Sequence, residues 1–239
     1  MDAERHDWIV FHRLRFAAPR NGAGRPLPGP TGARAWHLYP SGERDASGLP
    51  VPLGAVWGGF ALYADREAAE AGAAETDALP WMAEVVERWR ALAAPIHHHG
   101  VTSWAGDGPG EGRIAAAAND PGGRLVVMTS AGYAAPGPAD LPRIRAFIAG
   151  VDRSKAFFAG QAANRAVGSF AGVGVDGHDG LTLSLWSDDA AMARAAYREG
   201  VHRELIARHR GAAMFDRSSF TRARIVASAG SWDGIDPAA

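Results

Sequence analysis

Apolar and polar residues alternate over Leu181–Trp186, with leucine at every second position up to Leu185. This two-residue period predicts a half-buried β-strand. Ser187 or Asp188 then offers an oxygen to the free N–H groups of a helix start, and Asp188 suits the positive end of the helix dipole. We expect a helix from about Ala190 to Arg210, loosened at Gly200, because glycine costs roughly 1 kcal/mol relative to alanine inside a helix.

The same strand-to-helix pattern occurs earlier in the chain, over Gly54–Glu75 (GAVWGGFALYADREAAEAGAAE). Phe60 in this segment corresponds to Leu183 in the later one, and the cap Asp65 corresponds to Asp188, with the same separation in both pairs. A repeated unit of this kind predicts a duplicated chain with two similar halves.

The elements of the second half follow the order strand, helix, strand, strand, helix, strand. They are expected at Leu125–Ser130, Leu141–Gly150, Ala166–Val175, Leu181–Trp186, Ala190–Arg210 and Phe220–Ala227. This is the β-α-β-β-α-β order of the ferredoxin-like fold. We therefore predict an α+β protein whose two ferredoxin-like halves form a dimeric-type α/β barrel, with helices outside and a cavity between the sheets.

The first half is expected to begin with strands at Trp8–Phe16 and Ala35–Pro40, joined by a Pro- and Gly-rich loop over Pro19–Pro30. The turn-forming cluster Asn119–Gly123 (NDPGG) is the natural boundary between the halves. The expected halves are residues 1–120 and residues 121–239.

The amino-acid composition excludes several classes of function. The 239 residues are 47% hydrophobic and 21% charged, which is typical of a globular protein. The net charge of -1 gives no electrostatic attraction to nucleic acid, and the absence of cysteine excludes disulfides, iron–sulfur clusters and thiolate ligation of haem. No segment is apolar enough to span a membrane, and the charged start MDAERHDW does not read as a secretory signal, so we expect a cytoplasmic protein.

Two segments carry a family pattern. They are Leu183–Arg210 (LSLWSDDAAMARAAYREGVHRELIARHR) and Gly230–Pro237 (GSWDGIDP), with weaker echoes in AWHLYPSG and HGVTSWAGDGP upstream. With them, the chain from Leu181 to Pro237 resembles the C-terminal part of the spheroidene monooxygenase family of carotenoid-modifying enzymes. The matching positions are Trp186, Asp188, Met192, Gly200, His202, Glu204 and Ile206. The segment GAAMFDRSSF departs from the aromatic stretch usual in the family, so we expect a changed substrate pocket.

The resemblance implies a haem-dependent oxygenase that takes electrons from a ferredoxin and oxidises a long apolar polyene. For this chain we expect a small apolar substrate, carotenoid-like or a secondary metabolite, with a homodimer left open. It implies haem b with His202 as the axial ligand of the iron and His209 as the fallback. Glu199, which could satisfy the second ring nitrogen of the ligand, and Trp186 complete the expected cofactor-binding set. On the opposite side of the iron, Arg13 could supply the polar group that cleavage of the O–O bond needs, and His37 could line the pocket. The sequence does not identify the catalytic residues.

Other motifs favour plainer interpretations. In the run His97–His99, alternate side chains point to opposite faces of a strand, so only His97 and His99 could share an ion, and a solvated strand edge is the simpler interpretation. Gly172–Gly177 (GVGVDG) matches a dinucleotide motif in letters, but a strand rather than a helix follows it, which predicts a hairpin. Motifs of the common hydrolases, kinases and zinc proteases do not occur.

Two alternatives remain open beside the monooxygenase. The first is a haem-dependent lyase or dehydratase on the same barrel, which would need no reductant. The second is a non-catalytic barrel that binds haem or an apolar ligand.

Overall fold

The computed structural model describes residues 6–24, 26–101, 113–132, 137–173, 179–198, 215 and 217–239. Their order in the first half is β1 (Trp8–Asn21), β2 (Ala35–Pro40), β3 (Leu53–Tyr63), α1 (Arg66–Asp77), a short 3-10 turn η1 (Pro80–Glu84) and β4 (Val85–Gly100). The second half contains β5 (Arg124–Gly132), the turn η2 (Pro138–Asp140), α2 (Leu141–Ala159), β6 (Asn164–Ala171), β7 (Asp179–Trp186), α3 (Asp189–Ala193), the π-helical turn η3 (Arg194–Arg198) and β8 (Arg217–Gly230).

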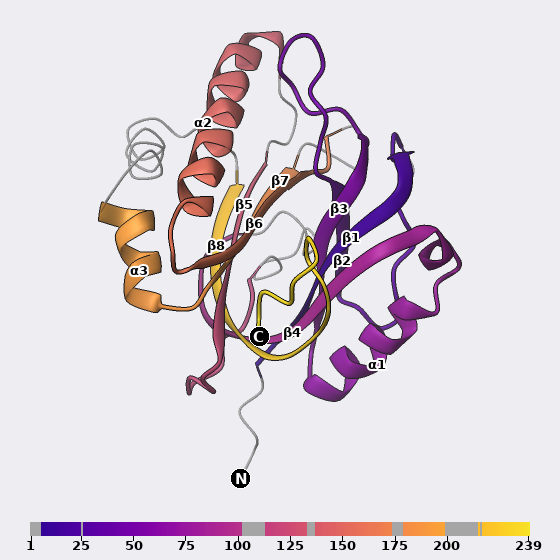
Figure 1. Ribbon diagram of the computed structural model, residues 1–239, viewed down its shortest axis with the longest axis vertical. Coiled ribbons are helices and arrows are strands. Elements are labelled where there is room, and N and C mark those ends of the chain that lie inside the picture. The colour runs from indigo at the N-terminus through magenta and orange to yellow at the C-terminus, as the bar shows by residue number, and fades with distance from the viewer. Residues whose placement is uncertain are drawn as a thin grey trace.

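The strands form one eight-stranded antiparallel sheet in the order β2-β3-β1-β4-β8-β5-β7-β6. Each half has its fourth strand beside its first, followed by its third and second, which is the ferredoxin-like order. The two halves join through the fourth strands, β4 and β8. The protein is therefore an α+β fold of two tandem halves, as the sequence predicts, with a loop in place of the first helix of the first half (Figure 1).

The sheet curls so that its two end strands approach each other. β6 lies against β2 and β3, although no ladder joins them. Gly58 on β3 makes this approach close: a Cβ atom there would lie 2.3 Å from Cζ of Phe170 on β6. We call this junction, where β6 meets β2 and β3, the seam of the barrel.

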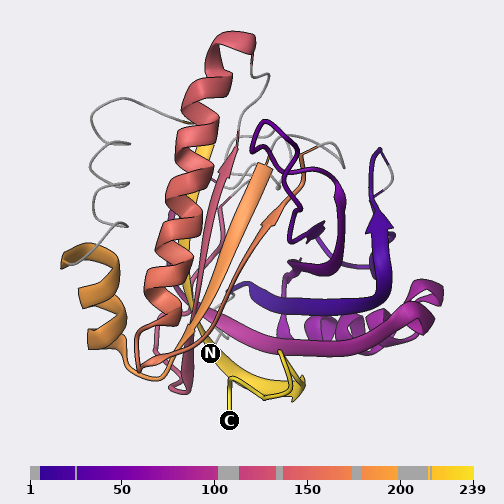
Figure 2. The ribbon, with the colours of Figure 1, turned by 45° about the horizontal axis from the view of Figure 1, so that its top comes forward.

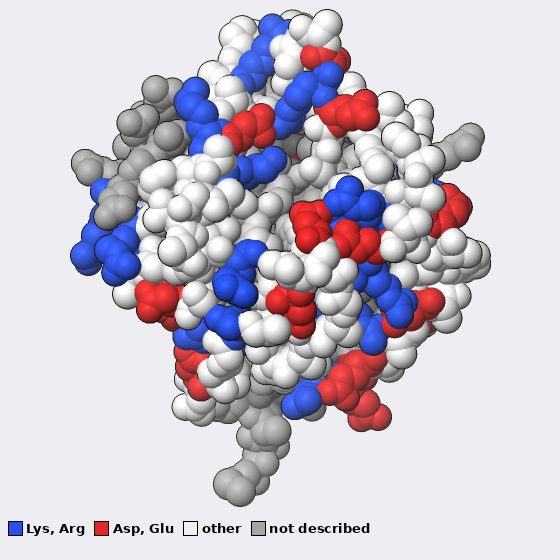
Figure 3. All heavy atoms as spheres, viewed as in Figure 1, with Lys and Arg blue, Asp and Glu red and all other residues white. Residues whose placement is uncertain are grey.

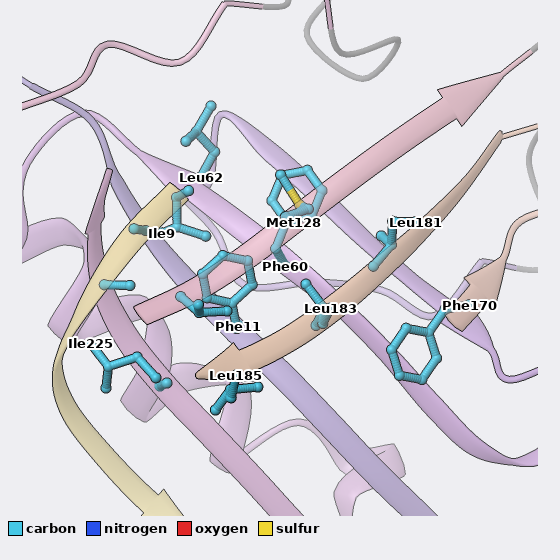
Figure 4. Close-up of a cluster of buried hydrophobic side chains, with 14 of the residues drawn as sticks. Ile9, Phe11, Phe60, Leu62, Met128, Phe170, Leu181, Leu183, Leu185 and Ile225 are labelled. Carbon is cyan, nitrogen blue, oxygen red and sulfur yellow. The ribbon is translucent and has the colours of Figure 1, made fainter. Parts of the chain in front are cut away.

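Alternate residues of the strands fill the interior. Side chains from both halves point toward one another between the two parts of the sheet (Figure 4). They include Ile9, Phe11, Phe60, Leu62, Met128, Phe170, Leu181, Leu183, Leu185 and Ile225. Leucines 181, 183 and 185 therefore face inward, which confirms the predicted period, and their burial supplies much of the apolar driving force for folding.

Helices cover the outer faces of the sheet, α1 on the first half and α2 with α3 on the second (Figures 1 and 2). Both predicted caps are confirmed, because Asp65 accepts a hydrogen bond from the N–H of Ala68 at 2.8 Å and Asp188 accepts one from Ala191 at 2.5 Å. No helix among the described residues is long and apolar enough to cross a membrane.

Several element boundaries differ from the sequence predictions, most clearly those of α2 and β1. α2 continues through Gly150 to Ala159, because Gly150 and Ser154 are small and form its buried side. β1 runs on to Asn21, and Pro19 is tolerated because it falls in an irregular stretch between Arg15 and Arg20 where the ladder to β3 is interrupted. The predicted helix Ala190–Arg210 is described only as far as Arg198 and includes a π-helical turn.

Candidate functional site

A cavity of about 220 Å³ lies at the seam between the two halves. Its apolar wall comes from Val56 on β3, from Val167, Gly168 and Phe170 on β6, and from Trp232 near the C-terminus. Its polar side comprises Arg13, Arg15, Ser41, Lys155 and Asp233. We call it the seam cavity. Figure 3 shows the molecule hollowed on this face, with mostly uncharged walls and charged side chains at the rims.

Arg13 is the buried cation of the seam cavity, with only 2% of its surface exposed. β1 points it into the barrel on the same face as Ile9 and Phe11. Its Nη1 donates to Glu87, its Nη2 donates to Asp233 at 2.5 Å, and its guanidinium lies 5.9 Å from the centre of the Trp232 ring. Its Nε is buried and has no partner among the described residues, so the N–H donor at this atom is unused.

Glu87 on β4 is the carboxylate that holds this cluster together. It accepts hydrogen bonds from Arg13, from Arg15 Nε at 3.1 Å, from Ser231 Oγ at 3.1 Å and from the N–H of Gly234 at 2.8 Å. Burial would raise the pKa of Glu87, but the Gly234 N–H and the two arginines outweigh it and lower the pKa to about 2. Glu87 is therefore a charged anchor at neutral pH.

The C-terminal turn closes this end of the barrel. Trp232 is buried and lies against Trp89, with the ring centres 5.4 Å apart. Asp233 adopts a left-handed backbone conformation, with φ of 52°, and accepts hydrogen bonds from both Arg13 and Arg15 at 2.5 Å. Asp236 accepts from Trp89 Nε1 at 3.2 Å. These contacts fasten the last residues of the chain to β1 and β4.

A bridge between the halves lies beside the seam cavity. Arg44, from the loop after β2, donates from Nη2 to both carboxylate oxygens of Asp152 on α2 at 3.0 Å. Lys155, one helical turn further along α2, lines the cavity with its Nζ 3.6 Å from Asp152. The bridge therefore brings a lysine of the second half opposite the arginines of the first.

The other sequence candidates lie in different places. His37 on β2 contacts the ring of Phe60 and lies 2.8 Å, Nδ1 to Oη, from the buried Tyr39, inside the barrel. Trp186 is fully buried on the outer face of β7, where its Nε1 donates to Ser184 at 2.9 Å and its ring meets that of Phe158. Of the candidates within the described residues, Arg13 alone reaches the seam cavity.

His202, His209 and Glu199 lie outside the described residues. Among the described histidines, His12 does not offer a site for haem. His12 is sealed under the edge of the Trp36 ring, where burial first and Arg90 second lower its pKa to about 3. The described residues also contain no group of three or more His, Asp or Glu that could hold a metal ion.

The histidine run at the end of β4 behaves as its alternation predicts. His98 pairs with Thr221 of β8, Nδ1 to Oγ1 at 2.9 Å, whereas His97 and His99 are exposed. Among the described residues β1 pairs with β4 only as far as Ala93, and beyond it the N–H of Ala117 donates to the carbonyl of Pro95 at 2.7 Å. A second cavity of about 450 Å³ borders His98, His99 and Arg113.

Comparisons with known proteins support the fold. No protein-family model matches the sequence, and no curated protein matches it either. The chain is similar in structure to an aldoxime dehydratase, OxdRE, crystallised with butyraldoxime: the match has a TM-score of 0.57 and 12% identity, and covers 94% of this chain and 81% of the other. Two proteins provisionally assigned as monooxygenases also match, and each match covers 95% of this chain. The protein from Lactobacillus acidophilus matches over 100% of its own chain, with a TM-score of 0.35 and 10% identity. The protein from Fusobacterium nucleatum matches over 96% of its own chain, with a TM-score of 0.39 and 8% identity.

At 12% identity, the likeness to the aldoxime dehydratase is a likeness of fold. The protein therefore has the fold of the dimeric-type α+β barrels.

Sequence reasoning missed most of this cluster. Glu87, Lys155 and Asp233 carry no motif of their own. One signal was available: Lys155 is the only lysine of a chain that otherwise uses arginine. Trp232 and Asp233 lie in the GSWDGIDP segment, which the family resemblance singled out without giving it a role.

Proposed function

We propose that this protein is an enzyme of the oxygenase type that receives a small, mainly apolar substrate in the seam cavity and holds its polar end on Arg13. The observation that carries this proposal is the combination of an apolar wall with a buried guanidinium whose Nε donor is unused. A binding site with mostly apolar walls and a few convergent polar groups is the usual form of a small-molecule site.

The finer proposal rests on the sequence resemblance. We propose haem b as the cofactor, with its iron on His202, a ferredoxin as the electron donor, and a carotenoid-like or secondary-metabolite substrate. Such a haem would supply oxygen activation. The part assigned to the chain itself is to bind the substrate between Phe170 and Trp232 and to orient its polar end at Arg13. A homodimer in the cytoplasm is part of the same proposal.

An absorption spectrum tests the cofactor. Protein produced with added haem should show a Soret band, and His202→Ala should abolish or strongly weaken it. His98→Ala is the matched control, because His98 is a described histidine that borders a cavity and pairs with Thr221, and it should leave the band unchanged. A wild-type protein without the band, or a His202→Ala variant with an unaltered one, would contradict the haem proposal.

A second candidate is a dehydratase. The likeness to an aldoxime dehydratase over 94% of this chain favours it, because butyraldoxime is a short apolar chain with one polar end, the kind of molecule that the seam cavity would accept. Anaerobic conversion of butyraldoxime to butyronitrile would establish this reaction. A product that forms only with O₂ and a reductant would establish the oxygenase instead.

A further inference from the structure

The charged groups around the seam cavity do not balance. Two ion-pair networks reach it, one around Glu87 and Asp233 and one around Asp152, where Lys155 lines the cavity and Arg44 pairs with the same carboxylate. Together they contain four cations and three carboxylates: Arg13, Arg15, Arg44, Lys155, Glu87, Asp152 and Asp233. Glu87 and Asp233 offset the two arginines of β1. Asp152 is shared between Arg44 and Lys155, so one positive charge is left over on the side of α2.

Hydrogen-bond donors are left over at the same place. Asp152 is 3.0 Å from Arg44 but 3.6 Å from Lys155, which is beyond hydrogen-bonding distance. The three N–H donors of the Lys155 ammonium therefore have no hydrogen-bond acceptor among the described residues. Arg13 Nε adds a buried donor without a partner. Unsatisfied donors and an excess positive charge around one cavity are the conditions that favour an anion.

The identity of Lys155 supports a specific role. The chain has 25 basic residues, and Lys155 is the only lysine among them. Its side chain is 29% exposed, so it reaches the cavity without being sealed away from water. A lysine ammonium is a compact point charge on a flexible stem, whereas arginine presents a rigid planar fork. The flexible ammonium can therefore move onto a ligand that the fixed Arg13 also contacts.

We infer that the seam cavity binds a monocarboxylate with a short apolar tail, with the carboxylate between Lys155 and Arg13 and the tail against Phe170 and Trp232. One carboxylate supplies the missing negative charge and accepts from the unused donors. The small volume, about 220 Å³, suits a short chain, and so favours the secondary-metabolite class of the proposed substrates over the carotenoid-like class. This inference deepens the proposed function, because it uses the same cavity and names the class of substrate.

Binding of hexanoate tests the inference, with hexanamide as the neutral molecule of the same size and acetate as the carboxylate without a tail. Calorimetry on the full chain should show hexanoate binding about tenfold more tightly than either. Lys155→Met should weaken hexanoate binding about tenfold and leave hexanamide unchanged. Arg153→Met removes the same charge from an exposed position on the same helix that does not line the cavity, and it should have no effect.

A spectroscopic signal locates the ligand independently. Protein labelled with ¹³C-lysine gives one lysine side chain in the NMR spectrum, because Lys155 is the only one. Hexanoate should shift this signal in a saturable way, and hexanamide should not. Equal binding of hexanoate and hexanamide, no binding of hexanoate, or a Lys155 signal that does not move would overturn the inference. Since these readouts involve neither haem nor turnover, they can succeed where the proposed reaction fails, and the reverse.

Discussion

Arg13 Nη2 donates a 2.5 Å hydrogen bond to Oδ1 of Asp233, which lies 220 residues further along the chain. The contact joins the first strand to the C-terminal turn at the mouth of the seam cavity. Asp233 achieves it from a left-handed backbone conformation, which asparagine and aspartate tolerate better than alanine does. The geometry of this turn therefore depends on the residue type at position 233.

Substitutions of Asp233 should separate its backbone role from its charge. Asp233→Asn keeps the residue shape, and its side chain is 59% exposed, so we expect a loss of stability below about 1 kcal/mol. Asp233→Ala should lower the stability by about 1 kcal/mol more, because alanine tolerates the positive φ at this position less well. Urea unfolding measures the difference. An alanine variant as stable as the asparagine variant would show that the backbone conformation is not strained.

Glu87 should make stability depend on pH in the acid range. Its pKa is lowered from 4.5 to about 2 in the folded protein, so the unfolded chain binds the proton more readily. The stabilisation is present above about pH 4.5 and is lost as the pH falls toward 2. Glu87→Gln should flatten the stability curve in this window, as measured by urea unfolding at a series of pH values. Parallel curves for the two proteins would contradict the role of Glu87 as the charged anchor.

His12 should make the stability depend on pH in a second, less acidic range. Burial lowers its pKa from 6.5 to about 3, so the unfolded state takes up a proton that the folded state does not. Stability should therefore decline as the pH falls from about 6.5 toward 3, and His12→Phe should remove that part of the decline. In NMR spectra the His12 ring signals should not titrate between pH 8 and 4. A titration midpoint near 6.5 would show that His12 is exposed to water.

Substitution of Gly58 tests the close packing between β3 and β6 at the seam. Gly58→Ala would place a methyl group 2.3 Å from Cζ of Phe170, and we expect a destabilisation of about 1–3 kcal/mol. The double variant Gly58→Ala with Phe170→Leu should lose less than the sum of the two single variants, because the smaller side chain makes room. Gly160→Ala, whose added atom would have its closest contact at 3.5 Å, is the control and should be close to neutral. Additive losses would mean that β3 and β6 do not pack as described.

The sequence predicted those parts of the fold that depend on neighbouring residues. Asp65 and Asp188 cap their helices because a carboxylate can reach the N–H three residues later, and this is a local event. The inward leucines of β7 follow from their two-residue period. The end of α2 was predicted wrongly because Gly150 is read locally as a stop, whereas in the fold Gly150 is a buried position inside a helix that continues to Ala159.

The site was less predictable. Arg13 was a weak candidate, and its partners Glu87 and Asp233 come from β4 and the C-terminal turn, so that only the folded sheet brings them together. Lys155 lines the same cavity as Arg13 and Asp233 because α2 of the second half reaches the seam. Contacts between segments so far apart leave no periodic signal in one sequence. The haem residues His202, His209 and Glu199 stay predictions, and Trp186 is placed in the packed outer layer.

The location of a bound ligand tests the central claim, that the seam cavity is the substrate site, most directly. A crystal structure with 6-bromohexanoate, whose bromine is located by anomalous scattering, should place the bromine near Phe170 and Trp232 and the carboxylate beside Arg13 and Lys155. Bromine found instead in the cavity beside His98, with the seam cavity filled only by water, would contradict the account.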